Sequence, residues 1–126
     1  MNRLKANVVI GITDILMAVV TLMSPFMIVG SAFDESFTEF GTTGVEGQTD
    51  ALANGLLIFG VISLALHIYG RIVSKKAGIS TTGHILGIIA ASLFAFIGAI
   101  MFIPSMVLYI LAAIFTLKQK NMAIAK

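Results

Sequence analysis

The sequence predicts an all-α fold: an integral membrane bundle of four transmembrane helices with both termini in the cytoplasm. Composition is the first reason, because 58% of the 126 residues are hydrophobic, only 11% are charged, and the mean hydropathy is +1.03. Soluble domains carry about a quarter charged residues. The second reason is that long apolar runs alternate with short polar stretches. We therefore expect one transmembrane domain, residues 1–126, whose first partner is the lipid bilayer.

The first two predicted spans cover residues 7–29 and 51–73, each long enough to cross a hydrocarbon core of about 30 Å. Each carries one face of small and polar residues. In the first span this face consists of Asn7, Gly11, Asp14, Ala18 and Thr21, and in the second of Ala53, Gly60, Ser63, His67 and Gly70. Pro25 predicts a bend in the first helix.

Residues 31–50 form the only long polar loop. Phe33, Phe37 and Phe40 recur at helical spacing among acidic residues, which predicts a short amphipathic helix in the membrane interface. Thr49 or Asp50 is the expected N-cap of the second span.

The last two predicted spans cover residues 83–102 and 105–118, with a cytoplasmic loop at 74–81 and a tight reversal at 103–105. Thr81 or Thr82 can cap the third span, and Pro104 suits the first turn of the fourth. The fourth segment is short, so an interfacial C-terminal helix after three spans is the alternative. Charge placement favours four spans.

All Lys and Arg residues fall on one side of the membrane if there are four spans: Arg3, Lys5, Arg71, Lys75, Lys76, Lys118, Lys120 and Lys126. Five of the six acidic residues lie in the 31–50 loop: Asp34, Glu35, Glu39, Glu46 and Asp50. The positive-inside rule then places the termini in the cytoplasm and the acidic loop outside. Because the basic residues are sorted by position instead of pooled in one patch, the net charge of +2 does not indicate nucleic-acid binding.

A stripe of small residues marks one face of the third span. It consists of Gly83, Gly87, Ala91, Ala95 and Ala99. Such small-xxx-small patterns let two helices approach closely in lipid. The stripe indicates packing inside the bundle, and an interface in a homo-oligomer or with another membrane protein is the alternative.

Asp14 is the only acidic residue inside a predicted span, and a carboxylate there is costly unless it faces the bundle interior. Matching depths from the cytoplasmic side gives Tyr109 and His67 as its candidate partners, whereas His84 is expected almost at the surface. The site is a proton or cation site in one interpretation and a structural hydrogen bond in the other. A position of His67 among headgroups, beside Tyr69 and Arg71, is a further alternative.

Catalysis and metal binding are not expected. Ser63, His67 and Asp14 could converge as a triad, but no strained nucleophile elbow or oxyanion motif accompanies them. The outer acids lack the spacing of a calcium loop, and the chain has no cysteine. We expect no enzyme activity, no cofactor and no metal.

The segment LLIFGVISLALHIYGRIVSKKAGISTTGHILGIIAASLFAFIGAIMFIPSMVLYILAAIFTL carries a glycine-rich helix, a Lys-Lys hairpin and a proline-turned final pair. It resembles small four-helix membrane proteins of Gram-positive bacteria that form a family of unknown function. The resemblance implies a multi-pass protein of the bacterial cytoplasmic membrane without known catalysis. Asp14 also invites comparison with small multidrug resistance exporters, which use a carboxylate in the first helix. This chain differs from them in having Asp instead of Glu, no tryptophan, a long outer loop and one fixed orientation.

These observations predict a non-enzymatic membrane protein that acts through protein or lipid contacts, as an accessory, stress-related or immunity-type component. The alternative is a small proton-coupled transporter of a cationic molecule that uses Asp14.

Overall fold

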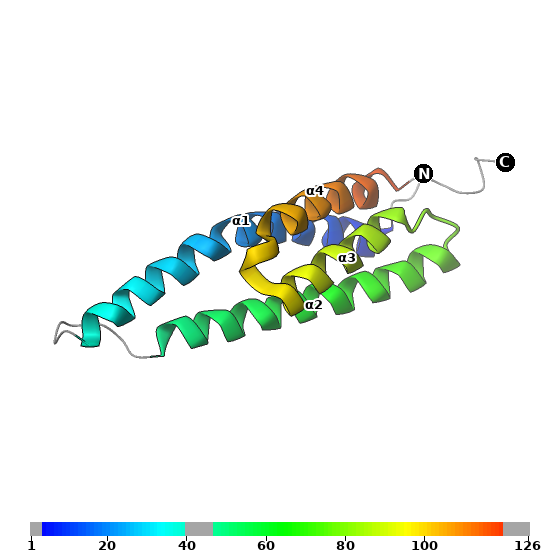
Figure 1. The fold of residues 1–126 in the computed structure, drawn as a ribbon. Coiled ribbons are helices and arrows are strands. Elements are labelled where there is room, and N and C mark those ends of the chain that lie inside the picture. The colour runs from blue at the N-terminus through cyan, green and yellow to red at the C-terminus, as the bar shows by residue number, and fades with distance from the viewer. Residues whose placement is uncertain (1–3, 40–46, 120–126) are drawn as a thin grey trace.

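The computed structural model describes residues 4–39 and 47–119, and within these ranges the chain is helical with no strand. The elements are α1 (Lys5–Glu39), α2 (Gln48–Lys76), α3 (Thr82–Ile97), the 3-10 turn η1 (Gly98–Met101) and α4 (Phe102–Lys118). The predicted all-α, four-helix architecture is confirmed. The helices form two antiparallel hairpins, α1 with α2 and α3 with α4 (Figure 1).

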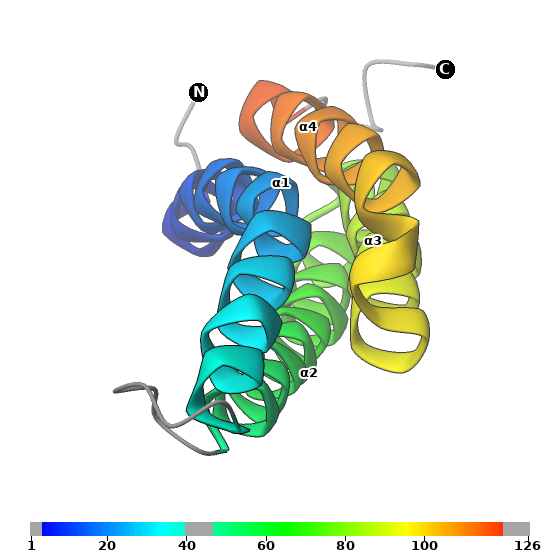
Figure 2. The same cartoon turned by 60° about the vertical axis from the view of Figure 1, so that its left-hand side comes forward.

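The four helices form a bundle of unequal lengths. In the turned view, α1, α4, α3 and α2 follow one another around it (Figure 2), and each of these neighbouring pairs is in contact. With 35 and 29 residues, α1 and α2 are about 52 and 43 Å long. The 16 residues of α3 reach only about 24 Å. The α1–α2 hairpin therefore extends well past the tip of the α3–α4 hairpin (Figure 1).

The first helix is longer than the sequence predicts. It continues without a break through Phe33 and Phe37, so the prediction of a separate interfacial helix is wrong; Phe40 lies outside the described residues. No glycine or proline interrupts residues 31–39, so nothing stops the helix there.

Pro25 lies inside α1 and cannot donate the usual hydrogen bond to the carbonyl of Thr21. The hydroxyl of Ser24 donates to that carbonyl instead, at 2.8 Å. A side chain thus satisfies the group that the proline leaves free.

The reversal between α3 and α4 lies at Gly98–Met101 and not at the predicted 103–105. Gly98 has a φ of 77°, a left-handed conformation that favours glycine, and this residue ends α3. Pro104 sits in the first turn of α4, where its missing N–H is not needed. Glycine, more than proline, therefore determines where the chain turns.

The N-terminus of α2 is capped by a side chain from α1. Neither Thr49 nor Asp50 is its N-cap; the helix begins after Gly47, and Glu35 accepts a hydrogen bond from the Thr49 N–H at 2.8 Å. This hydrogen bond, with those of neighbouring backbone N–H groups, lowers the pKa of Glu35 below its ordinary value of 4.5. The Thr49 hydroxyl also donates to Ser31 Oγ at 3.0 Å. At α3, Thr81 is the N-cap as predicted, although its side chain makes no cap bond.

Two helical stretches, Lys5–Phe37 and Gln48–Lys76, are long and apolar enough to cross a membrane, judged by length and composition. The apolar helices Thr82–Ile97 and Phe102–Lys118 are shorter.

Candidate functional site

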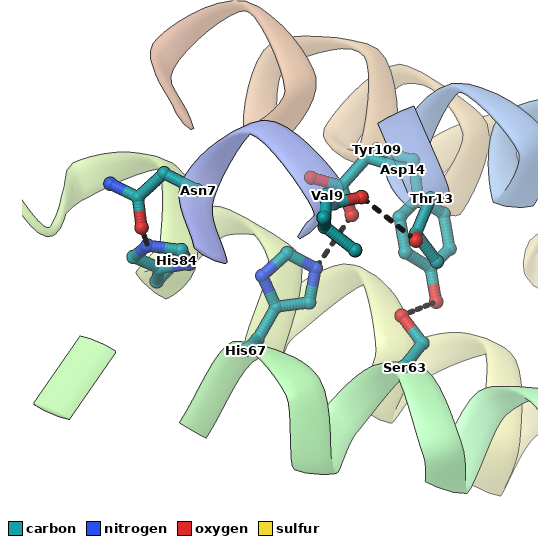
Figure 3. Close-up of polar contacts among 8 residues, drawn as sticks. All are labelled: Asn7, Val9, Thr13, Asp14, Ser63, His67, His84 and Tyr109. Atoms are coloured by element: carbon teal, nitrogen blue, oxygen red, sulfur yellow. Dashed lines mark hydrogen bonds and ion pairs between the residues drawn. The ribbon is translucent and has the colours of Figure 1, made fainter. Parts of the chain in front are cut away.

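The interior of the bundle holds a row of polar side chains contributed by all four helices. Towards the end of the molecule where α1 begins lie Asn7, Ser74 and His84; further along the bundle come His67 with Asp14, and then Ser63 with Tyr109 (Figure 3). All seven are buried. Burying a polar group costs free energy unless it has a hydrogen-bond partner. The cost of burying this row therefore depends on the partners of each side chain.

Asp14 and His67 form the centre of the row. His67 Nε2 lies 2.7 Å from Asp14 Oδ1, and both side chains are only 1% exposed. The close approach depends on Gly87 of α3, because a Cβ at this position would overlap the imidazole of His67. The structure thus brings together the two residues that depth matching paired, and it places His67 in the bundle interior instead of beside the exposed Tyr69.

A second cluster joins α1, α2 and α3. The Ser74 hydroxyl donates to Asn7 Oδ1 at 2.9 Å, and His84 Nε2 lies 3.1 Å from both of these oxygens. Gly70 makes room for the ring, since a Cβ there would lie 2.5 Å from His84 Cε1. The two imidazole centroids are 5.8 Å apart, so the clusters are neighbours.

Tyr109 is fully buried but bonds to a different partner from the one predicted. Its hydroxyl donates to Ser63 Oγ at 3.1 Å, and it forms no hydrogen bond to Asp14 among the described contacts. Of the predicted trio, Asp14 and His67 pair with each other, whereas Tyr109 pairs with Ser63. Ser63 is engaged with the phenol, and no hydrogen bond is found between Ser63 and His67, so the described geometry does not form a Ser-His-Asp relay.

Several buried atoms of the row have no hydrogen-bond partner in the described chain. They are Asn7 Nδ2, Asp14 Oδ2, His67 Nδ1 and His84 Nδ1; outside the row the same holds for Thr21 Oγ1, Ser105 Oγ and Thr116 Oγ1. Asp14 and His67 are hydrogen-bonded to each other, so a proton can be shared within this pair, whereas His84 is hydrogen-bonded to Ser74 and Asn7. Within the described residues, no group of three or more His, Cys, Asp and Glu side chains is arranged to hold a metal ion.

The small-residue stripe of α3 contacts helices on both sides. A Cβ at Gly83 would meet Thr116 of α4, Gly87 faces His67 of α2, and a Cβ on Gly60 of α2 would lie 3.0 Å from that of Ala95. Ala91 is completely buried, and the side chain of Ala99 lies outside the described part of the structure. The described stripe residues therefore pack within one chain.

Sequence reasoning missed the Asn7, Ser74 and His84 cluster. Counting residues from the helix end placed His84 near the surface, but the ring is 1% exposed because it packs against Asn7, Ser74 and Gly70. A signal was available: Ser74 lies four residues after Gly70, so it continues the small and polar face of α2. Asn7 lies on the same predicted face as Asp14.

Three apolar grooves accompany the row without reaching it. One of about 440 Å³ lies between α1 and α4, and the others, of about 410 and 210 Å³, lie along α2. None of the three is lined by Asp14 or His67. Comparison of the chain with protein-family models, curated protein sequences and solved structures gives no match.

Proposed function

We propose that this chain is a non-enzymatic integral membrane protein that acts through contacts with lipids or other membrane proteins within the bilayer. The observation that carries the proposal is the reversed polarity of the bundle. Its completely buried side chains include Asn7, Asp14 and Ser105, while Phe26 is 66% exposed and Ile100 is 84% exposed. In water, a surface with so many exposed large apolar side chains would promote aggregation. In a lipid bilayer, an apolar outer surface around a polar interior is what membrane proteins normally have.

Charge placement supports one orientation. Lys5, Lys75 and Lys118 are exposed at the end where α1 begins, and Asp34 and Asp50 lie at the opposite end. With the basic end in the cytoplasm, α1 and α2 cross the bilayer and the α3–α4 hairpin enters from the cytoplasmic side. Following the resemblance over the last two thirds of the chain, the membrane in this proposal is the bacterial cytoplasmic membrane.

The apolar hairpin tip is proposed to end inside the hydrocarbon core. Gly98 shares a groove with Ile28 of α1 and Leu57 of α2. From those two residues the first acidic side chains, Asp34 and Asp50, are six and seven positions away along their helices, about 9 to 10 Å. Ile100 therefore stops below the acidic end of the α1–α2 hairpin and faces lipid.

Single-cysteine labelling tests this arrangement, because the chain has no cysteine. In intact cells, an impermeant maleimide is expected to label Ser36→Cys at once and Lys76→Cys only after permeabilisation. Ile100→Cys should resist the reagent from either side and become labelled only after the protein is denatured in SDS, because a thiol in the hydrocarbon core does not ionise to the reactive thiolate. Recovery of the chain in the soluble fraction, or rapid labelling of Ile100→Cys by the impermeant reagent, contradicts the proposal.

The second candidate function is proton-coupled transport of a small cation, and the buried Asp14–His67 pair is the observation that favours it. The two candidates differ in their response to Asp14→Asn, which keeps the shape and a hydrogen bond. A protein that acts by contact tolerates this variant, whereas a proton-coupled carrier loses its function. Infrared difference spectroscopy of the carboxyl group in nanodiscs, with candidate cations added in turn, separates them directly. A carboxyl band that shifts when a cation is added favours the carrier.

A further inference from the structure

The groove between α1 and α4 is the largest of the three described apolar grooves, with a volume of about 440 Å³. Its floor is formed where two small residues, Ala18 and Ala113, bring the helices together. Its walls are the large apolar side chains of Ile15 and Val19 on one helix and of Ile110 and Ile114 on the other, all substantially exposed. A continuous apolar trough thus opens towards the outside of the bundle.

The length of the groove fits one leaflet of a bilayer. Along α4 it runs from Met106 to Leu117, twelve residues whose eleven helical steps span about 16 Å. Half of a hydrocarbon core of about 30 Å is about 15 Å. An acyl chain of a lipid in one leaflet can therefore lie along its whole length.

The basic residues near one end of the groove indicate which leaflet of the bilayer it faces. Leu117 is followed directly by the exposed Lys118, and α1 begins with the exposed Lys5. The two helix ends are tied together, because Gln119 Oε1 accepts a hydrogen bond from the Leu4 N–H at 2.6 Å and Gln119 Nε2 donates to the Leu4 carbonyl at 3.3 Å. Among the described residues neither lysine forms an ion pair.

We propose that the α1–α4 groove binds one anionic phospholipid of the cytoplasmic leaflet. Its acyl chain lies on Ala18 and Ala113, and its phosphate lies between Lys5 and Lys118. The charge of the lysines complements that of the headgroup. This inference rests on the proposed membrane insertion and names a lipid partner for it.

Fluorescence quenching tests the site, because the chain has no tryptophan. Ile110→Trp places a single reporter in the groove, and Ile62→Trp places one on the outer face of α2. The two positions are matched in depth, since their neighbours Tyr109 and Ser63 are hydrogen-bonded. Each variant of the full chain is reconstituted in phosphatidylcholine nanodiscs that contain either brominated phosphatidylglycerol or brominated phosphatidylcholine at the same mole fraction.

We expect brominated phosphatidylglycerol to quench Ile110→Trp with a higher relative binding constant than brominated phosphatidylcholine, and to show no preference at Ile62→Trp. In the Ile110→Trp background, Lys5→Gln and Lys118→Gln should each reduce the preference by about fivefold at low salt. Both lysines are exposed, so these variants are expected to fold, and circular dichroism checks that they do.

Equal quenching by the two lipids at Ile110→Trp overturns the inference, and so does an equal preference at Ile62→Trp, which would indicate a general lipid annulus. Failure of the chain to enter nanodiscs refutes membrane insertion and this site together. Insertion without selective quenching refutes the lipid site alone.

Discussion

The basic and acidic ends of the bundle are held together in different ways. At the basic end, hydrogen bonds between distant residues join four helices: Asn7 with Ser74 and His84, and Leu4 with Gln119. At the acidic end only α1 and α2 remain, and Thr49 of α2 is hydrogen-bonded there to Glu35 and Ser31 of α1. Interior polar groups therefore specify how the helices pack in the basic half. The acidic half is a two-helix hairpin whose helices are joined by the hydrogen bonds of Thr49.

The largest effect is expected from removing one partner of the central buried pair. His67→Ala leaves the carboxylate of Asp14 without its partner, and we expect a loss of about 3–5 kcal/mol in the free energy of unfolding. Reversible unfolding in mixed detergent micelles measures this loss. Tyr69→Ala, at an exposed position two residues away, is the control and should change stability little.

The pair is interpreted through a second variant. Asp14→Leu combined with His67→Leu removes both polar groups and should recover part of the lost stability, because neither is left without its partner. A double variant less stable than His67→Ala would contradict this expectation and show that the polar pair itself stabilises the bundle.

Glycine-to-alanine substitutions are expected to have opposite effects on stability in the packed half of the bundle and in the two-helix half. Gly87→Ala drives a methyl group into the His67 ring and should destabilise by about 1–3 kcal/mol. Gly55→Ala, in the part of α2 nearer the acidic end, meets open space and should stabilise by about 0.5–1 kcal/mol through helix propensity. The same unfolding measurement applies to both. Equal effects at the two positions would contradict the packing described at Gly87.

Serine variants test the hydrogen bonds of each end. Ser74→Ala removes the donor to Asn7 Oδ1 and a neighbour of His84, so a loss of about 1–3 kcal/mol is expected. Ser36→Ala removes only an exposed bond to the Ala32 carbonyl of its own helix and should change stability by less than about 0.5 kcal/mol. A reversed order would show that the basic-end cluster is not a stabilising contact.

The smallest effect is a pH dependence at the acidic end. The folded pKa of Glu35 is lowered, so its capping contribution is present above the ordinary value of 4.5 and is lost as the pH falls through the lower folded pKa. The amide proton shift of Thr49 in NMR spectra should therefore change below pH 4.5. In Glu35→Gln this transition should be absent, whereas Asp50→Asn should retain it.

Sequence patterns predicted the helices and the Asp14–His67 pair because both depend on periodicity and depth, which are local quantities. The exact path of the chain depended on particular groups. Gly98 sets the reversal through its backbone conformation, and Glu35 caps a helix other than its own. These features depend on residues in different helices or in a turn, and the periodicity of one helix does not predict them.

His84 shows why the rest of the site could not be predicted. Its burial follows from its contacts with Asn7 and Ser74 on two other helices and from the space left by Gly70, and both are properties of the assembled bundle. A count along one helix gives depth in a bilayer but says nothing about which neighbours cover a side chain.

The bond from Glu35 to the Thr49 N–H has a practical consequence for engineering. It fixes the ends of α1 and α2 to each other on the bundle side of residues 40–46, so the register of the hairpin does not depend on the connecting sequence. An epitope or a fluorescent domain is therefore best inserted between Glu39 and Gly47, because the entropic cost of closing a longer loop rises only slowly with loop length.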